Sequence, residues 1–316
     1  MRTRVLGLAM MLLAAAVGQV EAQGAETAGM ITELKPGRGR VDVRAAAGGD
    51  WKPAAPLQAV RPGDVLRASD NAVVVLAMTG GAGMVKVDAA VSPYTVPALR
   101  AGDGKVQKAR SLVEAGVGFL ATNAKEPPRA SLSTRGVSRP PVIIAPRNGL
   151  VLPEPLTIEW MGSRFTRYTV RVVGPAGVVF EQAGVTGGRF EYPASAPALG
   201  PGTRYTVLIA AAGHAAQEAW FTVADGPRAA AVRRELDTVG GLAGVTPNSQ
   251  AVLRAGVLAN EGFVYDARRE IVAALAKDGD EPALHQFLGA LYQQSGLPDL
   301  AVESFDEAQF LLTRAR

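Results

Sequence analysis

Hydrophobic and polar positions alternate along the first third of the chain, which predicts short, half-buried strands. From Met30 to Val96, apolar residues fall at every second position in segments such as GRVDVRA and NAVVVLAM. Gly, Pro and Asp pairs separate these segments, as turns between antiparallel strands require. Between Lys105 and Asn123 the period changes, and Val106, Leu112, Val113 and Val117 could line a helix. We assign residues 27–122 to an all-β N-terminal module that ends with this segment.

Residues 123–141 are polar and rich in proline, which predicts a linker; an edge segment that pairs loosely with a neighbour is the alternative. Strand signals return from Val142 to Val223 in seven short segments separated by turns. We therefore predict a β-sandwich as the middle domain, residues 142–224. After Asp225 the period becomes helical, and Gly240-Gly241 should stop a helix that begins near Arg228.

The C-terminal region repeats itself at an offset of 34 residues, a period typical of stacked helix–turn–helix units. Small and large apolar residues recur together: Gly262 with Gly296, Ala267 with Ala301, Ile271 with Phe305, Ala274 with Ala308, Ala255 with Gly289, and Leu258 with Tyr292. Thr246-Pro247 and Asp280 with Pro282 are signals for the start of a helix. We predict an all-α C-terminal domain over residues 228–316, a helical cap plus two repeats, and expect it to be separable.

Composition and charge narrow the function. The 316-residue chain has no cysteine, which excludes a disulfide scaffold, a thiolate metal site and a cysteine nucleophile. Its net charge of +4 is spread along the chain without a basic run, so we expect no nucleic-acid binding. Residues 248–316 differ: they hold six Lys or Arg and ten Asp or Glu, a net of −4, which suggests electrostatic docking on the chain itself or on a basic partner.

The first 22 residues have the pattern of a secretory signal peptide. Arg2 and Arg4 precede a short apolar stretch, and VEA before Gln23 offers a cleavage site. An uncleaved anchor is the alternative. No later stretch is apolar enough to span a membrane, so we expect a periplasmic protein with no transmembrane helix in the mature chain.

The first β module resembles the FecR-like domain of bacterial envelope proteins. The matching features are an opening Gly-x-Ile strand, the turn with Trp51, Pro53 and Ala54, and Pro62-Gly63-Asp64 before a strand. Thr79-Gly80-Gly81 stands where that family has an Asp-Gly turn. The resemblance implies an all-β module named from regulators of iron-uptake signalling. Those regulators also carry a sigma-factor-binding segment and a membrane helix, and this chain has neither.

Two further resemblances follow the chain. Residues 142–224 are similar to a fibronectin type III sandwich, with Trp160 ending the second strand and Tyr205 in the corner segment LGPGTRY. In such a corner the tyrosine hydroxyl bonds to the backbone a few residues upstream while its ring packs in the core. Residues 248–316 resemble tetratricopeptide repeats, although Arg254 stands where leucine is usual. Two units are fewer than the three that normally form a stable stack.

Few residues offer catalytic chemistry, and we expect neither an enzyme nor a cofactor. His214 and His285 are the only histidines, and no hydrolase or metalloprotease motif occurs. Asp278-Gly-Asp280-Glu281 is a fragment of a calcium loop at most, and helix capping is the better interpretation. Gly102-Asp-Gly104-Lys105 lacks the residues of a phosphate loop, so we interpret it as a turn and predict no metal site.

Two surfaces are candidates for binding a partner. Repeat geometry implies a concave groove lined by Val252, Gly256, Ala259 and Ala290 and by four amide side chains, Asn260, Gln286, Gln293 and Gln294. Such amides can bond to the backbone of a bound segment; ordinary solvated faces are the alternative. The second surface is the apolar run Phe310, Leu311 and Leu312, which a helix cannot bury entirely on one stripe. It should contact the sandwich, a second copy in a homodimer through the repeat end, or another partner.

These observations predict a non-enzymatic periplasmic scaffold or adaptor that binds another envelope protein or a cell-wall polymer. A component of a FecR-type transmembrane signalling system is one alternative. An enzyme of unidentified class is the other, and the lack of any positioned nucleophile, base or metal set argues against it.

Overall fold

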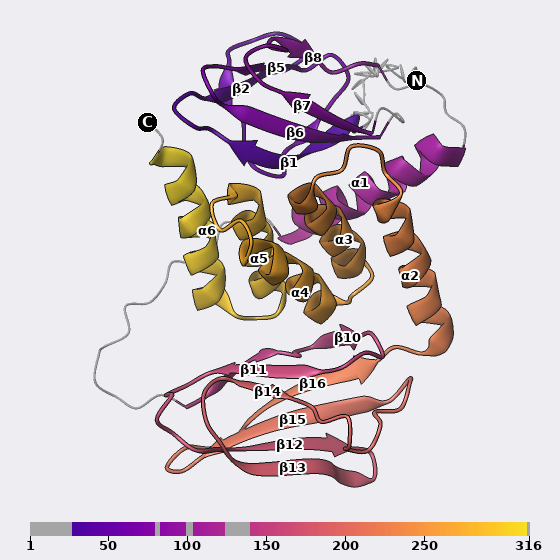
Figure 1. The fold of residues 1–316 in the computed structure, drawn as a ribbon, viewed down its shortest axis with the longest axis vertical. Coiled ribbons are helices and arrows are strands. Elements are labelled where there is room, and N and C mark those ends of the chain that lie inside the picture. The colour runs from indigo at the N-terminus through magenta and orange to yellow at the C-terminus, as the bar shows by residue number, and fades with distance from the viewer. Residues whose placement is uncertain (1–26, 80–82, 99–103, 124–139, 315–316) are drawn as a thin grey trace, which may run out of the picture.

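The computed structural model describes residues 27–79, 83–98, 104–123 and 140–314. A β-rich N-terminal part precedes an all-helical C-terminal part, in the order that the hydrophobic pattern predicts. Figure 1 shows the C-terminal helices between two groups of strands that are far apart in the sequence. The signal peptide (1–22), nearly all of the linker, and Gly102 and Asp103 of the predicted turn lie outside the described residues, whereas Gly104 and Lys105 begin a helix. Within those residues, no helix is long and apolar enough to cross a membrane.

Residues 27–98, which we call the N-terminal β module, form two four-stranded sheets. The sheet orders are β4-β1-β6-β7 and β3-β2-β5-β8. Ile31, Val74 and Leu76 from the first sheet and Leu66 from the second share one core. The strands are β1 (Gly29–Lys35), β2 (Val41–Arg44), β3 (Lys52–Pro53), β4 (Ala59–Val60), β5 (Val65–Ala68), β6 (Val73–Met78), β7 (Met84–Val87) and β8 (Tyr94–Thr95).

Strand β1 is buried on both faces, whereas its alternating sequence predicts burial on one. Met30 packs into a core formed mainly by helices, and Ile31 and Leu34 pack into the core of the β module. Strict alternation would place Glu33 beside Ile31, because residues two apart share a face. The pairing of β1 with β6 shifts register between Ile31 and Glu33. Such a bulge inserts one residue and reverses the facing, so Glu33 points to the helices and Leu34 to the core.

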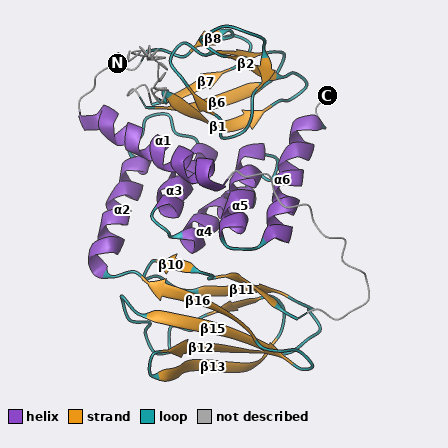
Figure 2. Ribbon diagram, turned by 180° about the vertical axis from the view of Figure 1, so that it is seen from behind, coloured by secondary structure: helices purple, strands orange, loops and turns teal. Residues whose placement is uncertain are grey.

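Helix α1 (Gly104–Asn123) packs mainly against the C-terminal helices, although the sequence analysis grouped it with the β module. Figure 2 shows it crossing α3. The crossing is close because both helices have glycine there: a Cβ added to Gly256 would lie 2.9 Å from Cα of Gly116. Near the end of α1 the rings of Phe119 and Phe287 stack with centroids 5.3 Å apart.

Residues 140–225, the middle β module, form two sheets around one core. The sheet orders are β10-β16-β15-β12-β13 and β14-β11-β9. Ile158 and Trp160 from the smaller sheet meet Val207 and Phe221 from the larger one. The described strands number eight where the sequence pattern suggested seven: β9 (Val142–Ala145), β10 (Gly149–Val151), β11 (Thr157–Met161), β12 (Tyr168–Gly174), β13 (Gly177–Val185), β14 (Arg189–Glu191), β15 (Arg204–Ala211) and β16 (Gln217–Val223).

The two aromatic residues singled out from the sequence lie in this core. Trp160 is buried and meets Tyr168 edge to face, with ring centroids 5.3 Å apart. Tyr205 is buried beside Phe221, and its hydroxyl accepts a hydrogen bond of 2.7 Å from the backbone N–H of Gly200. This bond ties the segment before β15 to the core.

The C-terminal helices, which we call the helical unit, are α2 (Gly226–Gly240), α3 (Pro247–Asn260), α4 (Val264–Leu275), α5 (Pro282–Gln294) and α6 (Pro298–Thr313). Gly262 and Gly296 have φ of +85° and +72° in the turns α3–α4 and α5–α6, a conformation that glycine adopts without strain. Thr246 caps α3. The cap of α5 is Glu281 rather than the expected Asp280, because the helix begins at Pro282.

The helical unit shares its core with other parts of the chain. One continuous apolar cluster joins residues of α2–α5 to Leu112, Phe119 and Leu120 of α1 and to Met30, Leu57 and Ala77 of the N-terminal β module. A fragment limited to the helical unit would expose this apolar surface. The helical unit therefore does not pack only on itself, and its separability stays a prediction.

The glycine crossing predicts opposite effects for two substitutions. Gly256→Ala should destabilise the chain by about 1–3 kcal/mol, because its Cβ collides with Gly116. Gly118→Ala, on α1 with nothing within 4 Å of its added Cβ, should be neutral or stabilise by up to about 1 kcal/mol. Urea denaturation followed by helical circular dichroism measures both. Equal shifts in the same direction would contradict the close crossing.

The corner tyrosine gives a second prediction. Tyr205→Phe should cost about 1 kcal/mol through the lost hydrogen bond, and Tyr205→Ala about 3–5 kcal/mol through the cavity it leaves. Tyr192→Phe is the control, because its hydroxyl bonds to the carbonyl of Pro197 at an exposed site. Thermal denaturation should show the largest loss of stability for Tyr205→Ala, a smaller loss for Tyr205→Phe and the smallest for Tyr192→Phe.

Candidate functional site at the junctions of the helical unit

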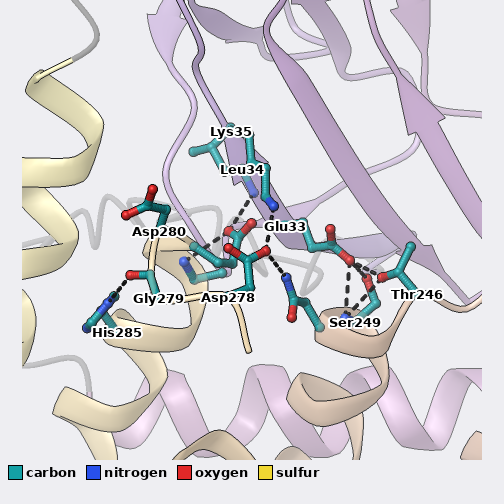
Figure 3. A network of polar contacts seen from close by, with 12 residues as sticks. Glu33, Leu34, Lys35, Thr246, Ser249, Asp278, Gly279, Asp280 and His285 are labelled. Carbon is teal, nitrogen blue, oxygen red and sulfur yellow. Dashed lines mark hydrogen bonds and ion pairs between the residues drawn. The ribbon is translucent and has the colours of Figure 1, made fainter. Parts of the chain in front are cut away.

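Strand β1 docks on the N-termini of two helices through a polar network (Figure 3). The carboxylate of Glu33 accepts hydrogen bonds from the hydroxyl and the backbone N–H of Ser249, at 2.7 and 3.2 Å, and from the hydroxyl of Thr246. The hydroxyls of Thr32 and Ser249 are 2.8 Å apart. A carboxylate at this end of α3 also interacts favourably with the helix dipole. Glu33 thus adds a cap from another part of the chain to the local cap, Thr246.

Glu281 makes the matching contact at the start of α5. Its Oε1 accepts from the backbone N–H of Leu34 at 2.9 Å and of Ala283 at 3.2 Å, so it caps its own helix and holds β1. The side chain is fully buried, and its Oε2 has no hydrogen-bond partner among the described residues. Burial raises the pKa of Glu281 to about 7, and the nearby charge of Glu33 adds to this effect.

An ion pair closes the exposed side of this network. Lys35 binds Asp278, whose Oδ2 also accepts from the side-chain amide of Asn248 at 2.8 Å. Burial opposes both charges, yet their contact outweighs it, raising the pKa of Lys35 and lowering that of Asp278. His285 contacts the carbonyl oxygen of Gly279 at 2.8 Å. The segment 278–281 thus holds β1 against the start of α5. The described residues contain no group of carboxylates and histidines that could bind a metal.

A second buried carboxylate joins the middle β module to α4. Asp266 Oδ2 accepts from the backbone N–H of Leu152 at 2.9 Å, and burial raises the pKa of Asp266 to about 7. The hydroxyl of the neighbouring Tyr265 accepts from the N–H of Thr157 at 2.9 Å, and Arg268 pairs with Glu159 at 2.7 Å. Each β module therefore presents a leucine amide to a buried carboxylate of the helical unit.

The predicted concave groove is covered by the chain's own helix α1. Gly256 lies against Gly116, and Ala290 is 1% exposed. The four amides do not form one surface. Gln286 and Gln293 are partly buried near opposite ends of α5, whereas Asn260 and Gln294 are exposed. Gln294 lines a cavity of about 240 Å³ against the middle β module. His214 lies in the turn between β15 and β16.

The three residues of the predicted C-terminal patch have different surroundings. Leu311 is buried, Leu312 packs partly against the core of the N-terminal β module, and Phe310 is 54% exposed. Leu312 and Gln286 line the same cavity of about 390 Å³ between this module and α5–α6, which we call the α6 cleft. Leu34, Val41 and Ala54 contribute apolar surface to it, and Gln309 and Thr313 contribute polar groups.

A second cleft, of about 460 Å³, lies between α2, α3, α4 and the loop after β10. Its arginines are already paired: Arg254 with Glu270 at 2.8 Å, Arg233 with Glu154 at 3.6 Å, and Arg269 with Glu154 at 3.7 Å. Arg254 is the residue that departs from the repeat pattern, and this ion pair explains its presence. Because its charges neutralise one another, this cleft is a weaker candidate for a ligand than the α6 cleft.

Sequence reasoning missed Glu33 and Asp266, and it assigned the segment of Glu281 to helix capping without predicting its contact with β1. Glu33 sits in an apolar strand segment, MITEL, and Glu281 directly precedes a helix-starting proline. A carboxylate in an apolar strand or at the start of a helix is stable only if hydrogen-bond donors lie close to it. The partners are more than two hundred residues away, at separations of 216 for Glu33 and 247 for Glu281, so local patterns could not identify them.

The buried Glu281 predicts a pH dependence. A folded-state pKa near 7, above the ordinary value of 4.5, means that the folded chain holds this proton more tightly than the unfolded chain. The protonated Glu281 therefore stabilises the fold below about pH 4.5. This stabilisation is lost as pH rises to about 7, so the free energy of unfolding should fall by roughly 3 kcal/mol across that range. Glu281→Gln keeps the acceptor for Leu34 and should flatten this slope in denaturation experiments across that range. The control is Glu307→Gln on the exposed side of α6. An unchanged slope in Glu281→Gln would refute the assignment.

Comparison with protein-family models finds no matching family, and a search of curated proteins finds no match. The resemblances to FecR-like, fibronectin type III and tetratricopeptide domains therefore stay predictions from the sequence. The described residues establish the coarser result: sheets in the N-terminal part, and five helices from Gly226 to Thr313 in the C-terminal part.

Proposed function

We propose that this protein is a non-enzymatic periplasmic adaptor that binds an extended segment of another envelope protein in the α6 cleft. In this proposal the N-terminal module is FecR-like, the middle module is a fibronectin-like sandwich, and α3–α6 are two tetratricopeptide repeats behind the cap α2. The helical unit holds the two β modules in a fixed arrangement. The partner then binds the α6 cleft, a surface formed by elements from both ends of the chain.

The observation that carries the proposal is the composition of the α6 cleft. Its floor is apolar, with Leu34 and Val41 at 2% and 4% exposure. Gln286 and Gln309 lie on its helical side, and amide side chains can bond to the backbone of an extended segment while apolar side chains fill the floor. At about 390 Å³, the cleft has room for a few side chains rather than for a whole helix.

The buried carboxylates favour a structural role over an enzymatic one. Groups with a pKa near 7 often act as general acids, and Asp266 and Glu281 have such values. Each accepts a backbone amide across a junction, from Leu152 or Leu34. A catalytic acid must instead lie within hydrogen-bond distance of the substrate atom that takes its proton. Glu281 is fully buried, so it supports docking of the modules rather than chemistry.

Site-specific photo-crosslinking tests the proposal. A photoreactive residue at Gln309, in the cleft, should capture a defined envelope protein in intact cells, whereas one at the exposed Arg234 on α2 should not. Thr313→Trp, which fills the cleft from its exposed side, should weaken binding of the purified partner at least about ten-fold, or about 1.4 kcal/mol. Thermal denaturation checks that this variant is folded. Equal capture from both positions, or full affinity in Thr313→Trp, would exclude the α6 cleft.

A further inference from the structure

The outer sheet of the N-terminal β module carries a cluster of arginines around a tryptophan. The guanidinium groups of Arg44 and Arg67 lie 4.8 and 4.3 Å from the ring centroid of Trp51, within the range of cation–π attraction. Arg67 also donates to Asp42 at 2.8 and 3.1 Å. Arg44 makes no ion pair with any described residue. The tryptophan thus holds in place an arginine whose charge is not neutralised.

Two further arginines extend this surface, which we call the distal face. Arg40 contacts Asp42 at 3.0 Å, and Arg38 is exposed. Both line a cavity of about 470 Å³ with Ser69 and Asp70. Asp42, buried beneath Arg40 and Arg67, and the exposed Asp70 are two carboxylates beside four arginines, so they offset only part of the positive charge. Figures 1 and 2 show that β2, β5 and β8 lie on the side of the β module turned away from the helices.

Helix α6 carries the opposite charge on its exposed side. Asp299, Glu303, Asp306 and Phe310 are spaced four, three and four residues apart, which places them on one side of a helix. Glu307 lies beside them. All four carboxylates are exposed, and none pairs with a cation in the part of the chain that the structure describes. We call this surface the acidic stripe; its Phe310 is 54% exposed, and the Arg314 guanidinium is 6.0 Å from the ring.

We propose that the distal face of one copy binds the acidic stripe of a second copy, head to tail. Arg40 also lines the α6 cleft, but no ion pair among the described residues joins the distal face to the acidic stripe of its own chain. Arginine suits this contact because its planar guanidinium forms paired hydrogen bonds with a carboxylate. Phe310 adds an exposed ring that an arginine of the partner can cover.

The geometry has a consequence for the assembly. A contact between two different surfaces leaves one free copy of each surface, so each added chain offers a further binding site. The assembly should therefore grow with protein concentration instead of stopping at a closed dimer, unless its rotation closes a ring. Exposed charges are screened by salt, with a Debye length of about 10 Å at 0.1 M and about 3 Å at 1 M. Salt should therefore dissociate the assembly.

Charge reversal tests the pairing in the purified chain. One variant combines Arg38→Glu with Arg44→Glu, which leaves the Arg67–Asp42 pair intact; the other combines Glu303→Lys with Asp306→Lys. None of these residues lines the α6 cleft, so the outcome is independent of the proposed function. The control combines two reversals off both surfaces, Arg234→Glu on α2 and Glu218→Lys on β16.

Sedimentation velocity should show that the parent and the control associate at about 0.05 M salt and dissociate near 0.5 M. Each reversed variant alone should need at least about ten-fold more protein to associate. A mixture of the two should associate as the parent does, because each altered surface then meets its complement. A parent that stays monomeric at low salt, or a mixture that stays dissociated, would overturn the proposal. So would a monomeric parent whose distal face binds an acidic polymer instead.

Discussion

The arrangement depends on how buried carboxylates of the helical unit are satisfied. A carboxylate in an apolar interior is costly unless it finds donors. Glu281 finds one donor in its own helix and the other in the backbone of β1, while Asp266 takes its donor from the middle β module. Separating either module would leave a buried acceptor without its amide. The same contacts that satisfy these charges therefore fix where both β modules sit, and β1, held against α5, contributes Leu34 to the α6 cleft.

Local features of this fold are well predicted from the sequence, and contacts across the chain are not. Alternation identifies strands, Thr246-Pro247 marks the start of α3, and Gly262 and Gly296 mark turns that need positive φ. Alternation alone misplaces Glu33, because the register shift after Ile31 depends on pairing with β6. The period predicts α1 as a helix but not its partner. A glycine such as Gly116 destabilises an isolated helix. Its role is seen only in the folded chain, where the absence of a side chain lets α1 approach α3 at Gly256.

The candidate site was predictable in parts. Repeat spacing identifies the positions on the inner helices, but it assumes that a groove between repeats is open. Here α1 covers it, and Gln286 lines the α6 cleft while Gln294 lines a different cavity. The apolar C-terminal run predicts a contact with the sandwich, a second copy or another partner, and this stays a prediction. The neighbour that Leu312 meets is the N-terminal β module, a contact that no local pattern encodes because it joins the two ends of the chain.

The route of the chain also constrains how it can fold. Thr32 and Ser249 are 217 residues apart, and Leu34 and Glu281 are 247 apart. In the middle β module even the most distant strand pair, β10 with β16, joins residues only 72 apart (Gly149 and Phe221, 221 − 149). Long-range contacts form late because closing a long loop costs entropy before any contact is gained. We expect the middle module to fold first, while the exposed side of β1 and the apolar side of α1 wait for the last helices. In that interval the chain exposes apolar surface that can aggregate, so the yield of folded protein should depend on how soon after β1 the helix α5 becomes available.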